Sequence, residues 1–183
     1  MTLKDIILGV IGSGTDPQEE YSVPLGQWIA RQGFHLVNGG GGGTMEAVAR
    51  GFQSHEGKSG LVLGILPAAK PCTTIEERKV YSPQTGYPNP HIDIPIRTHL
   101  PLSGNSGLQT GSRNHIVVLT ADIVVALPGS EGTRSEIQLC LEYKKPLVIL
   151  NTDGTWNDFQ NTDVAMVDSL DEVYQKIIQW KVS

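Results

Sequence analysis

The sequence has few cysteines, an excess of acidic over basic residues and no long apolar run, and each shortage excludes a class of protein. The two cysteines, Cys72 and Cys140, match no metal-ligand spacing, so we expect reduced thiols and no metal site. The formal net charge is -5. A nucleic-acid-binding protein normally concentrates positive charge to neutralise phosphates, so no nucleic-acid partner is expected.

Membrane-spanning and exported proteins are disfavoured by the same reasoning. No stretch approaches the roughly 20 apolar residues of a membrane span, and the N-terminus lacks a basic segment followed by an apolar run. We therefore expect a cytoplasmic protein with no membrane partner. A length of 183 residues suits one domain, and a single domain over residues 1–183 is predicted.

Glycine, in contrast, is abundant, with 21 residues that gather at the ends of apolar runs. Three runs are typical of strands buried in a parallel sheet. They are residues 6–11, followed by Gly12-Ser13-Gly14-Thr15, residues 34–38, followed by Gly39-Gly40-Gly41-Gly42-Gly43-Thr44, and residues 123–127, followed by Pro128-Gly129-Ser130-Glu131-Gly132-Thr133. Proline and glycine disfavour a continuing strand, so each cluster predicts a turn.

Helical patterns follow these turns and alternate with further strands. Asp16 is expected to cap the first helix, Pro24 to kink or delay it, and Gly33 to end it. Apolar residues at near-helical spacing follow Thr133, and residues 146–150 predict the next buried strand. The alternation predicts a doubly wound, mostly parallel α/β fold.

The remaining segments complete this pattern. Residues 60–66 predict a strand, and residues 92–100 predict another, which Pro95 places toward the sheet edge. Residues 107–119 predict a helix, and residues 151–166 predict a polar connection. A final amphipathic helix is expected after a cap at Asp168 or Ser169.

The glycine turns predict an anion-binding site. Ligands of open parallel sheets bind beyond the carboxyl ends of strands, where a helix N-terminus offers free N–H groups and a partial positive charge. Glu136, one turn into its helix, is placed to project toward such a ligand. For each feature a plain structural role stays open: a tight connector for residues 128–133, a flexible turn for residues 39–43, and a solvated charge for Glu136 or Arg113.

Two familiar nucleotide-binding patterns are not matched. The turns lack the Gly-Lys-Ser/Thr of a Walker motif and the full Gly-x-Gly-x-x-Gly spacing of a dinucleotide site, which disfavours an ATPase or a dehydrogenase. Residues 67–90 are rich in Pro, Thr and Gly and have no clear periodicity. A segment of this length in a compact domain is typically a lid or binding loop, so we expect it to border the site.

Three motifs in order resemble a known superfamily. They are Gly39-Gly40-Gly41-Gly42-Gly43-Thr44-Met45, Ser112-Arg113-Asn114 and Pro128-Gly129-Ser130-Glu131-Gly132-Thr133-Arg134-Ser135-Glu136. The resemblance is to the lysine-decarboxylase-like superfamily, which includes the LOG phosphoribohydrolases and the molybdenum cofactor carrier proteins. It implies a Rossmann-like fold and association into homo-oligomers, either dimers or tetramers. By position, Arg113 and Glu136 match the residues that the phosphoribohydrolases use to cleave an N-glycosidic bond.

The sequence departs from the phosphoribohydrolase pattern at three positions. Asn114 stands where that pattern has Lys, Ser130 where it has a second Gly, and Ser135 where it has the first Glu of a pair. The motifs are more similar to those of the carrier branch. That similarity implies a protein that carries molybdenum cofactor as an anionic ligand, with molybdenum enzymes as donor or recipient partners and no catalytic metal. Cleavage of a nucleoside 5′-monophosphate is the alternative.

Under the carrier interpretation no residue is catalytic, and Arg113 would donate a charge-assisted hydrogen bond to the anion. Ser130 and Thr133 would add hydroxyl donors. The candidate ligand-binding residues are Gly12, Ser13, Gly14, Thr15, Gly40, Gly41, Gly42, Gly43, Thr44, Arg113, Asn114, Pro128, Gly129, Ser130, Glu131, Gly132, Thr133 and Glu136.

Overall fold

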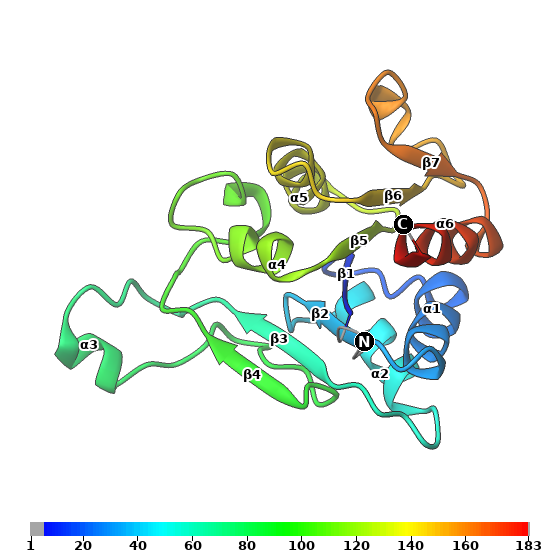
Figure 1. Cartoon of the computed structure of the whole chain (residues 1–183). Coiled ribbons are helices and arrows are strands. Elements are labelled where there is room, and N and C mark those ends of the chain that lie inside the picture. Colours follow the sequence, from blue (N-terminus) through cyan, green and yellow to red (C-terminus); the bar gives the residue numbers. More distant parts are fainter. Residues whose placement is uncertain (1–5, 183) are drawn as a thin grey trace.

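A computed structural model describes residues 6–182 as a seven-stranded sheet with helices on both faces (Figure 1). All neighbouring strands are parallel, in the order β4-β3-β2-β1-β5-β6-β7. The strands are β1 (Ile7–Ile11), β2 (His35–Asn38), β3 (Val62–Leu66), β4 (Ile94–Arg97), β5 (Ile123–Ala126), β6 (Leu147–Leu150) and β7 (Ala165–Val167). The predicted doubly wound, Rossmann-like α/β class is confirmed.

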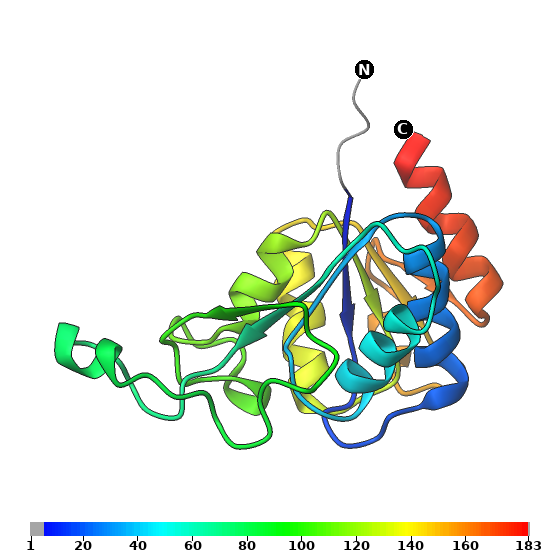
Figure 2. The same cartoon turned by 90° about the horizontal axis from the view of Figure 1, so that it is seen from below.

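Six α-helices are described, and five of them pack on the sheet. They are α1 (Glu19–Arg31), α2 (Thr44–Gln53), α3 (Ile75–Lys79), α4 (Asn114–Thr120), α5 (Glu131–Glu142) and α6 (Leu170–Val182). Helices α1, α2 and α6 enclose one apolar core, and α4 and α5 enclose the other, with the sheet between them. Helix α3 stands apart on an arm, residues 67–90, which projects beside the carboxyl ends of the strands (Figure 2).

The strand order reverses between β1 and β5. These strands run side by side with Leu8 opposite Ile123 and Ile11 opposite Ala126, although β2 follows β1 in the chain. Connections on the two sides of this point leave to opposite faces of the sheet, which opens a crevice at the carboxyl ends. The predicted glycine turns after β1 and β5 both lie at this crevice.

The two outer strands of the sheet are short. Strand β4 at one edge has four residues and contains Pro95, as the sequence predicted for an edge strand. Strand β7 at the other edge has three residues. Few backbone groups are therefore presented at either edge.

Two predicted element boundaries are wrong. The helix expected over residues 107–119 begins only at Asn114, because residues 107–113 form turns in which the Ser112 hydroxyl accepts the Asn114 N–H at 3.1 Å. Serine side chains compete in this way with helical backbone bonds. The segment expected as a plain connection contains the 3₁₀ turn η2 (Asn157–Phe159) and strand β7. Trp156 anchors that segment, since it is fully buried and donates from its indole nitrogen to the Leu127 carbonyl at 3.2 Å.

The predicted cap of the first helix is wrong, and the predicted cap of the last helix is confirmed. Asp16 does not cap α1 directly. Its carboxylate accepts the Gln18 N–H at 3.0 Å, and Gln18 adopts a left-handed φ of 43° before the helix begins at Glu19. The helix continues through Pro24, and Gly33 follows its end with a φ of 73°. At the last helix the prediction is confirmed, because the Ser169 hydroxyl accepts the Glu172 N–H at 3.4 Å.

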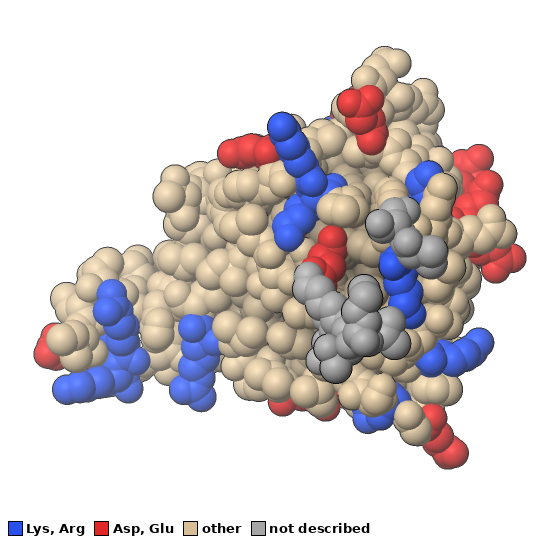
Figure 3. Space-filling view, viewed as in Figure 1, with Lys and Arg blue, Asp and Glu red and all other residues tan. Residues whose placement is uncertain are grey.

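Charged side chains of both signs are spread over the face shown in Figure 3. Helix α3 on the arm carries Arg78 and Lys79 in its last turn and Glu76 and Glu77 in its first, so the arm contributes charges of both signs. None of the helices in the described part of the chain has the length and apolar character needed to cross a bilayer.

Candidate functional site

The turns that follow β1 and β2 meet the first turns of α5 around one cavity of about 110 Å³, here called the glycine cavity. It is lined by Val10, Ile11, Gly12, Gly14, Gly39, Met45, Tyr87, Ser103, Gly104, Arg113, Asn114, Gly132 and Glu136. Pockets that enclose a whole small-molecule ligand usually measure roughly 300–1,000 Å³. The glycine cavity is therefore of a size to hold one end of a ligand.

Arg113 places a buried cation in this cavity. The residue immediately precedes α4 and is only 4% exposed. Its guanidinium lies so close to Gly39 that a Cβ at that position would overlap the terminal nitrogens. Its Nε has no hydrogen-bond partner among residues 6–182. A buried donor without a partner costs free energy, which an acceptor on a bound ligand would recover.

Glu136 faces Arg113 from helix α5. The two side chains approach to 3.6 Å between Oε1 and the guanidinium and are 10% and 5% exposed, respectively. Burial raises the pKa of the Glu136 carboxyl from 4.5 to about 7, and the positive charge of Arg113 opposes this shift. The carboxyl therefore changes its protonation state near neutral pH, next to a permanent cation.

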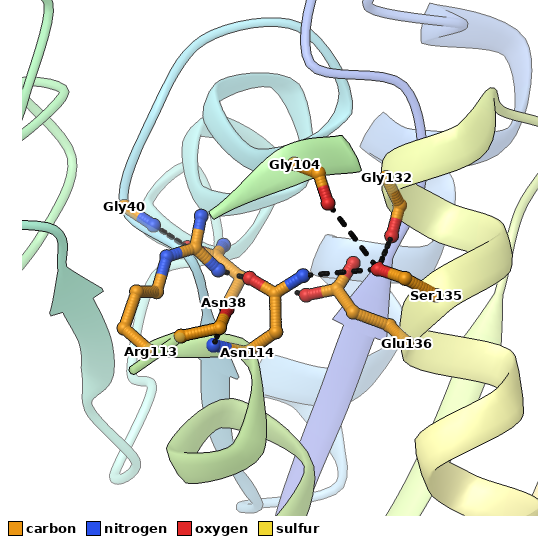
Figure 4. A network of polar contacts seen from close by, with 9 residues as sticks. Asn38, Gly40, Gly104, Arg113, Asn114, Gly132, Ser135 and Glu136 are labelled. Carbon is orange, nitrogen blue, oxygen red and sulfur yellow. Dashed lines mark hydrogen bonds and ion pairs between the residues drawn. The ribbon is translucent and has the colours of Figure 1, made fainter. Parts of the chain in front are cut away.

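Asn114 on α4 and Ser135 on α5 connect these two helices beside the cavity (Figure 4). The Asn114 amide nitrogen is 3.3 Å from the Ser135 hydroxyl, which donates to the Gly132 carbonyl at 2.7 Å. Gly107 allows this approach, since a Cβ there would collide with both side chains. The Asn114 Oδ1 has no partner in the described chain and stays available as an acceptor.

Thr133 adds a third unpartnered polar atom. Its side chain is buried in the first turn of α5, and its Oγ1 has no hydrogen-bond partner within the described residues. The hydroxyl lies directly against Gly129, where a Cβ would overlap it. The turn between β5 and α5 therefore brings an unused hydroxyl and a glycine backbone into contact.

Two asparagines fix the glycine loop after β2 from opposite sides. The Asn38 Oδ1 accepts the Gly40 N–H at 2.8 Å, while Asn89 donates from its backbone N–H to the Gly40 carbonyl and from its side chain to the Gly41 carbonyl, both at 2.8 Å. Gly40 and Gly43 have φ values of 75° and 60°, which favour glycine. Hydrogen bonds with both asparagines therefore hold the loop in place.

The profile of the SLOG cluster4 family matches residues 5–180. The chain belongs to this family. A relative that is 35% identical over 150 residues, covering 81% of this chain and 82% of its own length, is an uncharacterized protein of Archaeoglobus fulgidus.

Two solved structures are similar to this SLOG cluster4 chain throughout their length. The molybdenum cofactor binding protein from the phototrophic bacterium Rippkaea orientalis is 28% identical, with a TM-score of 0.72 and full coverage of both chains. The Moco carrier protein from Chlamydomonas reinhardtii is 26% identical, with a TM-score of 0.70 over 96% of this chain and 99% of its own. The resemblance inferred from the three motifs is confirmed.

The SLOG cluster4 fold brings one third of the candidate residues to the glycine cavity. These are Gly12, Gly14, Arg113, Asn114, Gly132 and Glu136. Thr15 and Gly43 instead line a separate hollow beside α2. Thr44 supports the turns from behind, since its N–H donates to the Ser13 carbonyl at 2.9 Å. The remaining candidate residues do not line the cavity. They are Ser13, Gly40, Gly41, Gly42, Pro128, Gly129, Ser130, Glu131 and Thr133.

Sequence reasoning missed several residues that line the cavity, among them Met45, Tyr87, Ser103 and Gly104. Tyr87 lies in residues 67–90, which were expected to border the site, and this expectation is confirmed for that residue. Ser103 and Gly104 come from a turn whose Gly104 carbonyl lies 3.3 Å from the Ser135 hydroxyl. Nothing in their local sequence separates them from an ordinary surface turn.

Proposed function

We propose that this protein binds, protects and carries molybdenum cofactor, whose anionic end enters the glycine cavity. The observation that carries the proposal is the unused hydrogen-bonding capacity there. Within the described chain, Arg113, which lines the cavity, has a buried Nε without a partner, and Thr133, next to the lining residue Gly132, has a buried hydroxyl without one. An anionic group supplies acceptors for such donors, and a guanidinium forms strong, charge-assisted bonds to it.

The names of the similar structures support the same proposal, since one is a molybdenum cofactor binding protein and another a Moco carrier protein. The cofactor is cargo here. Arg113 would bind its anionic part, the glycine turns would let the backbone approach it closely, and Asn114 would orient a donor on the ligand. We propose further that the protein works in the cytoplasm as a homo-oligomer and exchanges cargo with molybdenum enzymes.

A second candidate function is hydrolysis of the N-glycosidic bond of a nucleoside monophosphate. One observation favours it: Glu136 is buried beside Arg113 and its pKa is raised to about 7. A carboxyl that titrates near neutral pH suits general acid–base chemistry or stabilisation of a ribosyl cation. Glu136 and Arg113 would be the residues involved.

One pair of measurements separates the two functions. The protein is purified from cells that make the cofactor and analysed for bound pterin and molybdenum, and it is also assayed for release of free base from nucleoside monophosphates. A carrier retains pterin and releases no base. Rapid base release that disappears in Glu136→Gln would contradict the carrier function.

Three variants refine the assay. Arg113→Ala should lose the bound pterin, because it removes a charged hydrogen bond worth roughly 1.5–3 kcal/mol. Glu136→Gln should keep it, because Glu136 is the one acidic residue among the described residues that line the cavity. The matched control is Arg134→Ala, since Arg134 lies on the same helix as Glu136 but pairs with Asp158 and Glu131 outside the cavity lining.

A further inference from the structure

Tyr87 is the one aromatic side chain among the described residues that line the glycine cavity. It lies at the foot of the arm, defined here as the residues between Gln84 and Pro90 that lead from α3 back to β4. The other lining groups are glycine backbone, aliphatic or thioether side chains, and the polar cluster of Arg113, Asn114, Glu136 and Ser103. The face of an aromatic ring offers no hydrogen-bond donor to a small anion but suits contact with another planar ring, so it can serve a different part of a ligand.

The position of Tyr87 is fixed by the glycine loop. Atoms Cε1 and Cζ of its ring would lie 2.8 Å from a Cβ at residue 41, and the hydroxyl 2.9 Å, so only glycine allows this approach. Two residues further on, Asn89 is 5% exposed and donates to the carbonyls of Gly40 and Gly41. The foot of the arm is thus bound to the same loop that forms the cavity wall.

The hydroxyl of Tyr87 takes no part in holding it there. No hydrogen bond to this hydroxyl is present within residues 6–182, although the Tyr87 N–H donates to the Gln84 carbonyl at 3.1 Å. Packing of the ring against Gly41 therefore sets its place. The ring is preorganised before any ligand arrives, which lowers the conformational entropy that binding would cost.

We propose that Tyr87 is a specificity-determining residue that recognises a flat heteroaromatic ring joined to the anion bound at Arg113. The binding of an anion at Arg113 rests on the proposed function. The cavity encloses too little space for a whole ligand, so the remainder must leave it past the lining residues. Contact between an aromatic side chain and a planar heterocycle is favourable for any ring with a π face. A pterin and a purine share this chemistry.

The test compares phosphate ligands with and without a ring on the same variants. Isothermal titration is run with inorganic phosphate, ribose 5-phosphate, adenosine monophosphate and a pterin alcohol phosphate ester. The variants are Tyr87→Leu, which removes the ring, and Tyr87→Phe, which removes only the hydroxyl. Tyr81→Leu is the matched control, because Tyr81 lies on the same arm but lines a different hollow.

The wild type should bind at least one ring-bearing ligand more tightly than its ring-free counterpart, by roughly 5- to 100-fold. Tyr87→Leu should lose most of this gain and keep its affinity for inorganic phosphate within about twofold, a change too small to reflect a lost contact. Tyr87→Phe and Tyr81→Leu should keep the gain. Added affinity for the pterin ester supports the carrier function, and added affinity for adenosine monophosphate alone supports the hydrolase function. Both support the role of Tyr87.

Other outcomes overturn the proposal. Wild-type protein that binds phosphate with no gain from either ring would remove the role of Tyr87 and leave the anion site standing. Two results would mean that the arm supports the site only through its structure and that Tyr87 does not contact the ring. One is an equal loss of affinity for phosphate and for the ring-bearing ligands in Tyr87→Leu. The other is loss of the added affinity for ring-bearing ligands in Tyr81→Leu. Failure of the wild type to bind any of the four ligands would overturn the anion site and this proposal with it.

Discussion

At the scale of single residues, Glu136 couples folding to pH. Its pKa rises from 4.5 to about 7 on burial, so between these values the folded protein holds a proton that the unfolded chain releases. The stabilisation is complete below pH 4.5 and is lost as the pH rises through 7. The difference between the two pKa values limits this stabilisation to at most about 3 kcal/mol. Glu136→Gln, which cannot ionise, should therefore lose less stability than the wild type between pH 5 and pH 8, as measured by urea unfolding.

The same carboxyl should make anion binding dependent on pH. An ionised Glu136 lies beside Arg113 and repels an incoming anion, whereas a protonated one does not. Phosphate affinity should rise by several-fold more in the wild type than in Glu136→Gln as the pH falls from 8 to 6. The ligand's own protonation affects both proteins equally, so their ratio isolates the carboxyl. A constant ratio in calorimetric titrations would show that Glu136 does not sense the anion.

Gly39 illustrates how strongly one backbone position controls the site. A Cβ there overlaps the Arg113 guanidinium, which is enclosed and has little room to move. Gly39→Ala should weaken phosphate binding by about tenfold or more, as expected for a displaced charged hydrogen bond. Gly111→Ala is a suitable control, because its Cβ would meet its nearest neighbour, Leu102, at an ordinary 3.4 Å. Equal affinity in both variants would contradict the close approach at Gly39.

At the scale of elements, the arm over residues 67–90 combines a free tip with a fixed foot. Helix α3 at the tip has no buried residue and is held by a capping box in which Thr74 and Glu77 exchange hydrogen bonds. At the base, the Gln84 N–H donates to the Pro67 carbonyl at 3.1 Å. An isolated helix of five residues is marginal in water. The tip is therefore the part of the arm that opens most readily.

Hydrogen exchange should reveal this division. With a phosphate ligand bound, exchange should slow at the foot around Tyr87 and Asn89, while α3 should exchange rapidly with and without ligand. The reason is that the foot contacts the cavity wall, whereas helix α3 at the tip has no buried residue. Unchanged exchange at the foot would remove its role in ligand binding. Slowing over the whole arm would instead make it the lid that the sequence suggested.

The sequence predicted the elements whose apolar pattern is strong and complete. Strands β1, β2, β5 and β6 match apolar runs of the sequence, and the glycine turns predicted after β1, β2 and β5 lie at the carboxyl ends of those strands. Strand β7 was missed because three residues carry too little periodicity. The helix expected over residues 107–119 was too long because serine and glycine redirect its first half.

The candidate site shows a similar limit. Arg113 and Glu136 were named from motifs, but their burial and ion pair depend on the packing of α4 against α5. Tyr87 could not be named, because only the tertiary contact between the arm and Gly41 brings it to the cavity. Sequence periodicity describes how an element faces the core. It does not show which loop from a distant part of the chain lines the cavity.

At the scale of the whole molecule, the cavity joins parts of the chain that are far apart in sequence. Its walls come from β1, the loop after β2, the arm and helices α4 and α5. A ligand bound there should stabilise the entire fold, by about 2.7 kcal/mol at a concentration one hundred times its Kd. Thermal unfolding with increasing ligand should show a rising Tm in the wild type. The Tm of Arg113→Ala should stay constant, and a parallel rise would place the ligand elsewhere.

The outermost strands also govern how copies of this protein can meet. One edge of the sheet ends in a strand interrupted by proline, and the other in a strand of only three residues. Neither offers the long row of free backbone groups that a strand of another molecule needs for pairing. Copies that associate must therefore join through helices and loops instead of extending the sheet from one molecule into the next. Short, proline-interrupted edges of this kind disfavour the edge-to-edge pairing that starts fibre-like aggregation.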